Sequence, residues 1–291
     1  MAQEYLKVLT NFKNIEIAGI VGKSISNIKK ILKIKKIKVF KNIDEMYSKT
    51  KAHGVICAVN ETSTYDVLYN LSKYRWFILC EKPLGLNYSE SKKIKKLKNN
   101  KKLFVALNRR YFSSTQILEK LLKKDKSTRI IEINDQEVNK NINKLKSIKK
   151  YWMYCNSIHL IDFIYFFGRG KITQIDNQGS IKKNFVFSKI KFSSGDTVYY
   201  KALWNRPGPW MITVSTIENY YKLRPLENLK TIKINRKITH YKKSKLDIKY
   251  KAGLHELIKN FIKKLENKKN NLINFTYSHK LMKLINNIYN V

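Results

Sequence analysis

The sequence is short of cysteine and of long apolar runs, and each shortage excludes a class of protein. The three cysteines, Cys57, Cys80 and Cys155, form an odd set without metal-type spacing, which favours reduced thiols over a disulfide framework. The longest apolar runs, 76–80 and 161–167, fall far below the about 20 residues that a membrane helix needs. The N-terminus does not show the pattern of a secretory signal. We therefore expect a cytoplasmic protein without a membrane partner.

Acidic residues are also scarce. The chain has 21 Asp and Glu residues against 60 Lys and Arg, a formal net charge of +39. Such an excess ordinarily suggests nucleic-acid binding. Here the charge is mostly Lys, is spread along the whole chain and accompanies many Asn and Ile, a pattern typical of AT-rich codon usage. A focused basic stripe with stacking aromatics would indicate otherwise. We expect weak, salt-sensitive binding of polyanions and no specific nucleic-acid partner.

Apolar runs of strand length alternate with helical patterns in the first part of the chain. This alternation predicts a Rossmann-like, doubly wound parallel sheet in a domain over residues 1–124. Asn42 with Glu45, and Asn87 with Glu90, have the spacing of helix capping pairs. The sequence predicts a helix over 2–13 and another over 26–33, and strands over 15–21, 37–40, 54–59, 76–80 and 103–108.

The pattern changes after about residue 125. Several segments alternate with a period of two, and the chain closes with two helical segments at 254–267 and 277–289. These features predict an α+β domain over 125–291 with a mostly antiparallel open sheet. A chain of 291 residues suits two domains of ordinary size. The strand candidates of this part are 172–176, 184–192, 197–204 and 210–217.

The segment Trp76–Cys80 runs directly into Glu81-Lys82-Pro83. A buried strand that ends in charged residues delivers them to the carboxyl edge of the sheet, where open α/β sheets bind ligands. Together with Asn108-Arg109-Arg110 and the His159-x-x-Asp162 pattern, this motif resembles the Gfo/Idh/MocA oxidoreductases. The resemblance spans nearly the whole chain and keeps the order of elements. It implies an NAD(P)-dependent oxidoreductase acting on a carbohydrate-related small molecule, and a homo-oligomer.

The resemblance assigns catalysis to Lys82 and His159. Transfer of a hydride from a carbinol carbon requires the hydroxyl proton to leave, so a proton-holding group must touch that oxygen. A partly desolvated Lys drops toward a neutral pKa, and imidazole titrates near physiological pH. Asp162 lies three residues after His159 on the same helical face. It could orient His159 or point into the domain interface.

The remaining site residues follow from the same resemblance. We expect the cofactor, NAD or NADP, to contact Asn60, Glu81, Lys82 and Pro83, with Lys23 and Ser24 at the end of the 15–21 strand. A cation and a hydroxyl there, in place of an acidic residue, favour NADP. We predict no metal ligands. The expected substrate-binding residues are Asn108, Arg109, Asp162 and Tyr154.

One element of the family is absent from the sequence. The strand and the G-x-G-x-x-G turn that cradle the pyrophosphate do not occur, and a helical pattern begins almost at the first residue. Two explanations stay open. Met1 is internal to a longer protein, or the chain is a truncated, non-catalytic member that keeps the scaffold without binding the cofactor.

Overall fold

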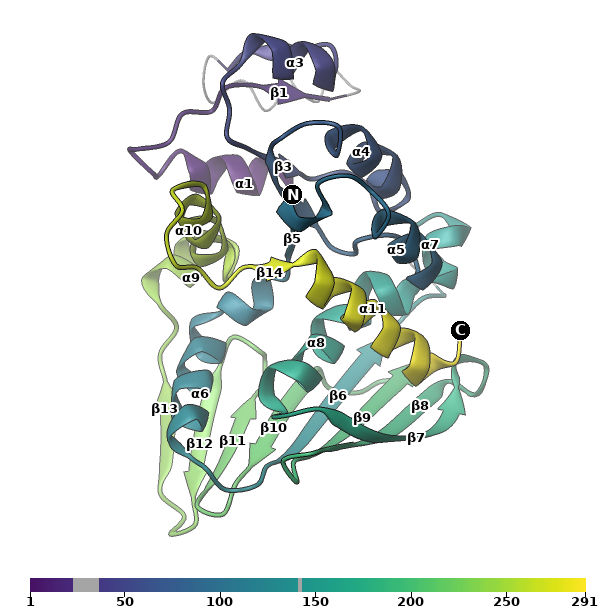
Figure 1. The fold of residues 1–291 in the computed structure, drawn as a ribbon. Coiled ribbons are helices and arrows are strands. Elements are labelled where there is room, and N and C mark those ends of the chain that lie inside the picture. Colours follow the sequence, from purple (N-terminus) through teal and green to yellow (C-terminus); the bar gives the residue numbers. More distant parts are fainter. Residues whose placement is uncertain (23–36, 141–142) are drawn as a thin grey trace.

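The computed structural model describes residues 1–22, 37–140 and 143–291. Parallel strands and helices of the N-terminal half lie above a large sheet built by the C-terminal half (Figure 1). The predicted helix over 26–33 lies outside the described residues. The helices and strands of the N-terminal half are α1 (Ala2–Leu9), β1 (Ile20–Val21), β2 (Val39–Phe40), α3 (Ile43–Lys49), β3 (Gly54–Cys57), α4 (Thr64–Leu71), β4 (Phe77–Glu81), α5 (Tyr88–Ile94), β5 (Leu103–Ala106) and α6 (Ser113–Lys124).

The C-terminal half contains most of the strands. Its eight-stranded sheet has the order β13-β12-β11-β10-β6-β9-β8-β7, in which only the β6–β9 pair is parallel. The elements are β6 (Ile130–Glu137), α7 (Lys146–Lys150), α8 (Ile158–Phe167), β7 (Ile172–Ser180), β8 (Phe185–Phe192), β9 (Thr197–Trp204), β10 (Met211–Ser215), β11 (Asn219–Leu223), β12 (Leu229–Lys233), β13 (Ile238–Tyr241), α9 (Lys245–Lys249), α10 (Leu254–Leu265), β14 (Ile273–Asn274) and α11 (Phe275–Tyr289).

The predicted fold class is confirmed, with one correction in the first sheet. β3, β4 and β5 are parallel neighbours, whereas β1 and β2 form a separate parallel pair. The strand predicted over 15–21 is reduced to Ile20–Val21, which within the described residues pairs with the two-residue strand β2. The end of the chain also joins this half, since β14 pairs antiparallel with β5.

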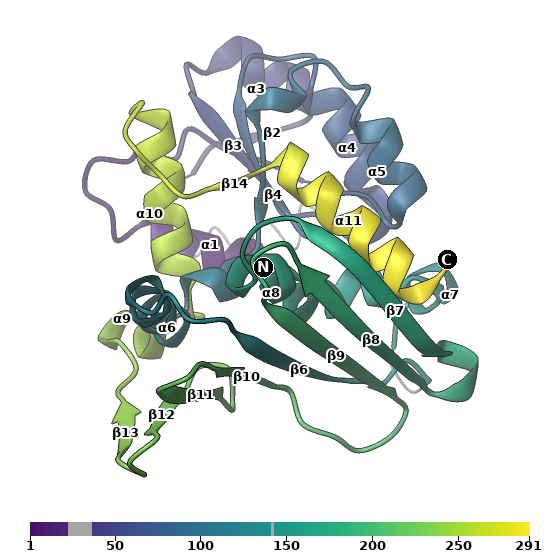
Figure 2. The same ribbon diagram turned by 60° about the horizontal axis from the view of Figure 1, so that its bottom comes forward.

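Helices cover both faces of the β3–β4–β5 sheet. Successive side chains of a strand point to opposite faces, and in β4 Ile78 and Cys80 belong to one apolar cluster while Leu79 belongs to another. The Leu79 face packs against α1 and α10, and the opposite face packs against α4, α5 and α11. Two views of the ribbon agree with this arrangement (Figures 1 and 2). The division between residues 124 and 125 stays a prediction.

Both predicted capping pairs are confirmed. The Asn42 side chain accepts a hydrogen bond from the Glu45 amide at 2.8 Å, and Glu45 accepts one from the Lys41 amide. Asn87 and Glu90 repeat the arrangement at the start of α5, where the Glu90 carboxylate accepts from the amide of Leu86. Each pair satisfies backbone N–H groups that the first helical turn leaves without a partner.

No helix in the described ranges is both long and apolar enough to cross a membrane. All three cysteines are buried and free. The large sheet is covered by α6, α8 and α11 on one face only (Figure 1), so its strands alternate between buried and exposed residues, as in β8 and β9. The large sheet is thus open on its other face, as predicted for the second domain.

Candidate functional site

Lys82 follows directly on β4, where the strand leaves the sheet edge at Pro83. Its side chain is half-buried, and its Nζ donates a hydrogen bond of 2.5 Å to the carbonyl oxygen of Cys155. Cys155 lies in a single π-helical turn, Met153–Ser157, that precedes α8. Burial lowers the pKa of the Lys82 ammonium, while the neighbouring Glu81 opposes this shift. The structure therefore connects the predicted catalytic lysine of the first half to a helix of the second.

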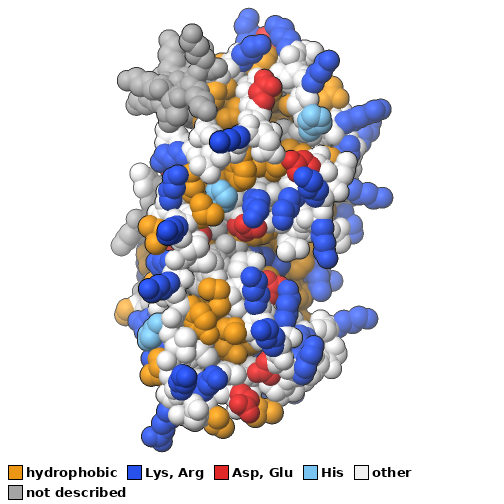
Figure 3. Space-filling view, turned by 90° about the vertical axis from the view of Figure 1, so that its left-hand side faces the viewer, with side chains coloured by type: hydrophobic (Ala, Val, Ile, Leu, Met, Phe, Trp, Pro, Cys, Tyr) orange, Lys and Arg blue, Asp and Glu red, His pale blue; other side chains and the backbone are white. Residues whose placement is uncertain are grey.

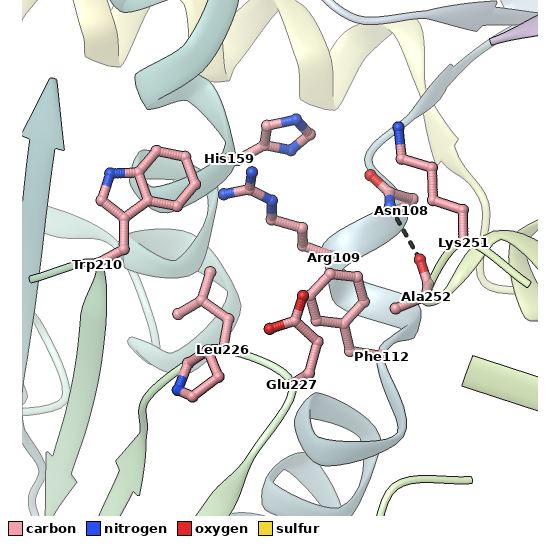
Figure 4. Close-up of a pocket in the computed structure, with 10 residues that line it drawn as sticks. Asn108, Arg109, Phe112, His159, Trp210, Leu226, Glu227, Lys251 and Ala252 are labelled. Carbon is pink, nitrogen blue, oxygen red and sulfur yellow. Dashed lines mark hydrogen bonds between the residues drawn. The ribbon is translucent and has the colours of Figure 1, made fainter. Parts of the chain in front are cut away.

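A cavity of about 260 Å³ lies between the two halves, beside the carboxyl end of β5 (Figure 4). Asn108 and Arg109 come directly after β5, and His159 comes from α8. Lys82 is not among the residues that line the cavity. The lining residues are Asn108, Arg109, Phe112, His159, Trp210, Pro225, Leu226, Glu227, Lys251 and Ala252.

Arg109 extends its guanidinium group into this cavity between His159 and Trp210 (Figure 4). The guanidinium carbon lies 4.1 Å from the centre of a Trp210 ring, within the range of cation–π contact. The Trp210 indole is held by a 2.8 Å hydrogen bond from its Nε1 to the carbonyl oxygen of Gln136. Burial lowers the pKa of Arg109 to about 10, so the group is a cation at neutral pH.

His159 is 6% exposed, and its Nδ1 makes no hydrogen bond within the described residues. Burial, together with the cations Arg109, Lys82 and Lys251, lowers the pKa of His159 well below its ordinary value. At neutral pH the side chain is therefore a neutral imidazole, which can accept a proton. Of the predicted site residues, Asn108, Arg109 and His159 line one cavity, whereas Lys82 lies outside its lining.

Asn108 is fixed by contacts with the segment before α10. Its Nδ2 donates to the carbonyl oxygen of Ala252 at 3.0 Å. The following residue, Gly253, has a φ of +72°, and a Cβ atom there would lie 2.2 Å from the Asn108 carbonyl oxygen. Only glycine suits this close approach. The contact brings Lys251 and Ala252 to the cavity from a distant part of the sequence.

Asp162 and Tyr154, both predicted to bind substrate, lie away from the cavity. Asp162 is 2% exposed, and its carboxylate accepts hydrogen bonds from Arg110 and from the Tyr277 hydroxyl. It therefore does not orient His159, and of the two alternatives it takes the structural one at the interface between the halves. The buried Tyr154 donates its hydroxyl to Asn286 of α11 at 3.3 Å.

The predicted cofactor-binding residues lie at strand ends. Glu81 ends β4 and accepts a 2.6 Å hydrogen bond from the Tyr5 hydroxyl, which connects the strand to α1. Pro83 is buried, and Asn60 is exposed after β3. Lys23 and Ser24 lie outside the described residues. Glu81, Lys82 and Pro83 thus stand at the carboxyl end of β4, the edge at which open α/β sheets bind ligands. The sequence contains no glycine-rich turn of the kind that holds a pyrophosphate.

The sequence prediction named Asn108, Arg109 and His159 among the cavity residues and missed the others, of which Trp210, Glu227 and Lys251 bear on the chemistry of the site. Trp210 and Glu227 lie in the stretches 210–222 and 224–227, which resemble late strands of the family. That resemblance did not assign a binding or catalytic role to either residue. Lys251 is one lysine among many, and no local pattern distinguishes it. Among the described residues, no group of three or more His, Cys, Asp or Glu side chains is placed to hold a metal ion.

A buried acidic pair lies behind the cavity at the end of β6. Glu137 accepts hydrogen bonds from Trp152, at 2.6 Å, and from Asn156. The nearby Asp135 accepts from the Tyr200 hydroxyl at 2.7 Å. Burial and the neighbouring carboxylate raise the pKa of Glu137 to about 9. The pair thus carries a proton at neutral pH, because two adjacent carboxylates cannot both ionise in a dry site.

A parallel sheet whose strand ends meet a second, open-sheet domain is the architecture of two-domain nucleotide-binding oxidoreductases. Residues 1–109 match the model of the oxidoreductase family with an NAD-binding Rossmann fold. This family, GFO_IDH_MocA, is the one that the motifs resemble, so the match over these residues confirms the resemblance. No curated protein sequence matches the chain.

Solved structures with the same fold cover the whole molecule. UDP-N-acetylglucosamine 3-dehydrogenase GnnA from Acidithiobacillus ferrooxidans has a TM-score of 0.78 at 12% identity, over 99% of this chain and 92% of its own. The dehydrogenase MviM from Clostridium difficile has a TM-score of 0.80 at 19% identity, over 99% and 95%. A super-repressor mutant of Gal80p from Saccharomyces cerevisiae has a TM-score of 0.81 at 12% identity, over 98% and 90%. Identities this low indicate a common fold alone.

Proposed function

We propose that the protein is an NAD(P)-dependent oxidoreductase that transfers a hydride between a nicotinamide cofactor and a sugar, sugar derivative or similar hydroxy or keto compound. The observation that carries the proposal is the pairing of Lys82, at the edge of the parallel sheet, with the carbonyl oxygen of Cys155 in the turn before α8. The same helix, α8, brings His159 to the cavity that Arg109 also lines. The family's NAD-binding fold and the sugar-nucleotide dehydrogenase among the similar structures support it.

The roles of the side chains follow from their protonation. The cofactor, when bound, supplies or accepts the hydride. His159 is neutral and can take the hydroxyl proton of the substrate at a ring nitrogen. Lys82, with its lowered pKa, can hold or relay that proton or polarise a carbonyl oxygen. Asn108, fixed by its bond to Ala252, offers its side-chain carbonyl oxygen to a substrate hydroxyl.

Substitution of Lys82 by Met tests this assignment. The change keeps the length of the side chain and removes the proton-carrying group, so kcat/KM should fall by about 100-fold or more. Oxidation of NADH or NADPH with a panel of keto sugars and keto acids provides the measurement. Lys96→Met, at an exposed position, is the control and should keep the wild-type rate. A Lys82→Met enzyme as active as the control would contradict the assignment.

A second candidate is a non-catalytic member of the family that keeps the scaffold. The structural similarity to a super-repressor mutant of Gal80p favours it. It differs from the first proposal in cofactor binding. Titration of the chain with NADH and NADPH, followed by energy transfer from tryptophan to the dihydronicotinamide, separates the two, because binding of either cofactor excludes the scaffold proposal. The same titration compares the affinities for NADH and NADPH. We propose a preference for NADP, inferred from Lys23 and Ser24.

A further inference from the structure

The guanidinium group of Arg109 has no anionic partner. None of the ion pairs in the described ranges includes it, and its Nη1 is buried without a hydrogen bond in those ranges. The next residue provides a contrast, because Arg110 is paired with Asp162 through two of its nitrogens. A buried polar atom without a partner is costly and rare in native proteins. Nη1 of Arg109 is therefore a donor for which the described residues supply no acceptor.

The surroundings of Arg109 point to the type of group that is missing. His159 Nδ1, buried in the same cavity lining, also makes no hydrogen bond with described residues. The lining contains two cations, Arg109 and Lys251, against one carboxylate, Glu227. Glu227 forms no ion pair within the described parts of the chain, and Lys82 adds a further cation close to His159. The carboxylates whose charge acts on Arg109 are Glu227 and the Asp135–Glu137 pair, and that pair shares one proton at neutral pH. Against Arg109, Lys251 and Lys82 the site therefore keeps an excess of positive charge beside unpaired donors.

The geometry of the guanidinium group indicates which class of anionic ligand it can bind. The guanidinium carbon lies 4.1 Å from the centre of a Trp210 ring. A guanidinium group donates its hydrogen bonds in its own plane, so a ligand accepts them along the edge of the group. An edge-on guanidinium matches a planar carboxylate, which can accept two parallel hydrogen bonds. A volume of about 260 Å³ suits a compact molecule. Size and geometry together favour a small acid over a neutral sugar.

We propose that the substrate of this site carries a carboxylate, as in a sugar acid or another small hydroxy or keto acid, and that Arg109 binds this carboxylate edge-on against Trp210. The inference rests on the proposed function, which it makes more specific. In this arrangement the acid is held from the side of the second domain, so that its hydroxyl or keto group faces His159. Trp210 acts as a positioning residue because it fixes the plane of the guanidinium group.

Matched pairs of ligands test the proposal on the full chain without any turnover. Calorimetric titration compares D-gluconate with D-glucitol, L-tartrate with L-threitol and D-glycerate with glycerol, at one ionic strength. In each pair the alcohol lacks only the carboxylate charge or charges. We expect at least one acid to bind about tenfold or more tightly than its alcohol. Inorganic phosphate serves as a tetrahedral anion that a guanidinium group can also bind with two hydrogen bonds; it should bind more weakly than that acid, and tighter binding would indicate a phosphorylated substrate instead.

Variants then assign the preference to Arg109. Arg109→Gln should abolish the difference between acid and alcohol, and Arg109→Lys, which keeps the charge without the fork, should keep part of it. Arg75→Gln, at an exposed position, is the control and should bind like wild type. Thermal unfolding of each variant shows that it is folded. The proposal is overturned if no acid binds better than its alcohol, if phosphate binds more tightly, or if folded Arg109→Gln keeps the preference.

The oxidoreductase function and the carboxylate inference can be contradicted separately. A chain that binds acids through Arg109 and yet binds no nicotinamide cofactor contradicts the oxidoreductase function alone. A chain that reduces a neutral keto sugar at equal rates with and without Arg109 contradicts the carboxylate inference alone.

Discussion

At the residue scale, the acidic pair on β6 determines part of the pH dependence of stability. The pKa of Glu137 is about 9 in the folded protein and about 4.3 in an unfolded chain. The folded state therefore binds more protons than the unfolded state between these values. Linkage then requires the free energy of unfolding to decrease as the pH rises through this window. The proton that stabilises the buried pair at low pH is lost at high pH.

Substitution of Glu137 by Gln removes this titration. We expect the difference in the free energy of unfolding, variant minus wild type, to increase between pH 5 and pH 9, a window from the pKa values above. Urea unfolding at several pH values provides the measurement. Glu119→Gln, on the surface helix α6, is the matched control and should show a much smaller trend. A Glu137→Gln difference that is constant or falls with pH would contradict the assigned pKa.

Histidine illustrates how burial changes a prediction made from residue type. An exposed imidazole titrates near neutrality, which was the reason for assigning His159 to proton transfer. Its burial on α8, next to three cations, keeps it neutral. We therefore limit the proposed role of His159 to accepting a proton, because a neutral imidazole with a lowered pKa is not protonated and so has no acidic proton to donate.

At the scale of elements, one ion pair holds the two halves together. Arg110, directly after β5, pairs with Asp162 on α8, and Tyr277 of α11 donates a hydrogen bond to the same carboxylate. The guanidinium group also lies over the rings of Phe166 and Tyr277. Three elements distant in sequence thus meet at a single buried carboxylate, which explains why Asp162 is not free to contact a substrate.

Asp162→Asn should destabilise the protein strongly. The change leaves the buried Arg110 cation without its counter-charge, and such losses cost about 3–5 kcal/mol. Chemical denaturation followed by tryptophan fluorescence provides the measurement. The control is Asp176→Asn on the exposed strand β7, which we expect to change stability by no more than about 0.5 kcal/mol. Equal effects of the two substitutions would show that the Arg110 contact contributes nothing beyond a surface pair.

At the scale of the whole molecule, the positive charge is dispersed. On the face shown in Figure 3, Lys and Arg side chains are scattered among neutral and apolar ones and do not gather in one stripe. This distribution agrees with the interpretation of the +39 charge as a compositional bias on solvated surfaces. The absence of specific nucleic-acid binding stays a prediction, as does weak binding to polyanions.

The open face of the eight-stranded sheet is where we expect copies of the chain to associate. Tyr199 on β9 is 44% exposed there, and Phe187 on β8 is 38% exposed. Analytical ultracentrifugation should show a homo-oligomer for the wild-type chain, and Tyr199→Lys should shift it toward the monomer because it places a charge in the contact. Tyr69→Lys on α4, where the tyrosine is 50% exposed, is the control. Identical sedimentation of the two variants would exclude this face.

The sequence by itself determined the features that depend on neighbours in the chain. The apolar run before Glu81-Lys82-Pro83 specified β4 and its end, and the Asn–Glu pairs specified the starts of α3 and α5. Alternation with a period of two identified β7 to β10, while β11, β12 and β13 were not resolved as separate strands. Local patterns were sufficient here because hydrogen bonding and burial within a few residues decide where these elements lie.

Only the tertiary structure decided which side chains share the cavity. Lys251 reaches it because Gly253 packs against Asn108, and Trp210 reaches it because its indole bonds to Gln136. The same long-range packing assigned Asp162 to Arg110 and left Arg109 without an anion. These contacts join residues that are 52 (Arg110 and Asp162), 74 (Gln136 and Trp210) and, beside Gly253, 144 (Asn108 and Ala252) positions apart, and no spacing in the sequence encodes them. The sequence could name Lys82, His159 and Arg109 as site residues, but the lack of a partner for Arg109 is a property of the folded molecule.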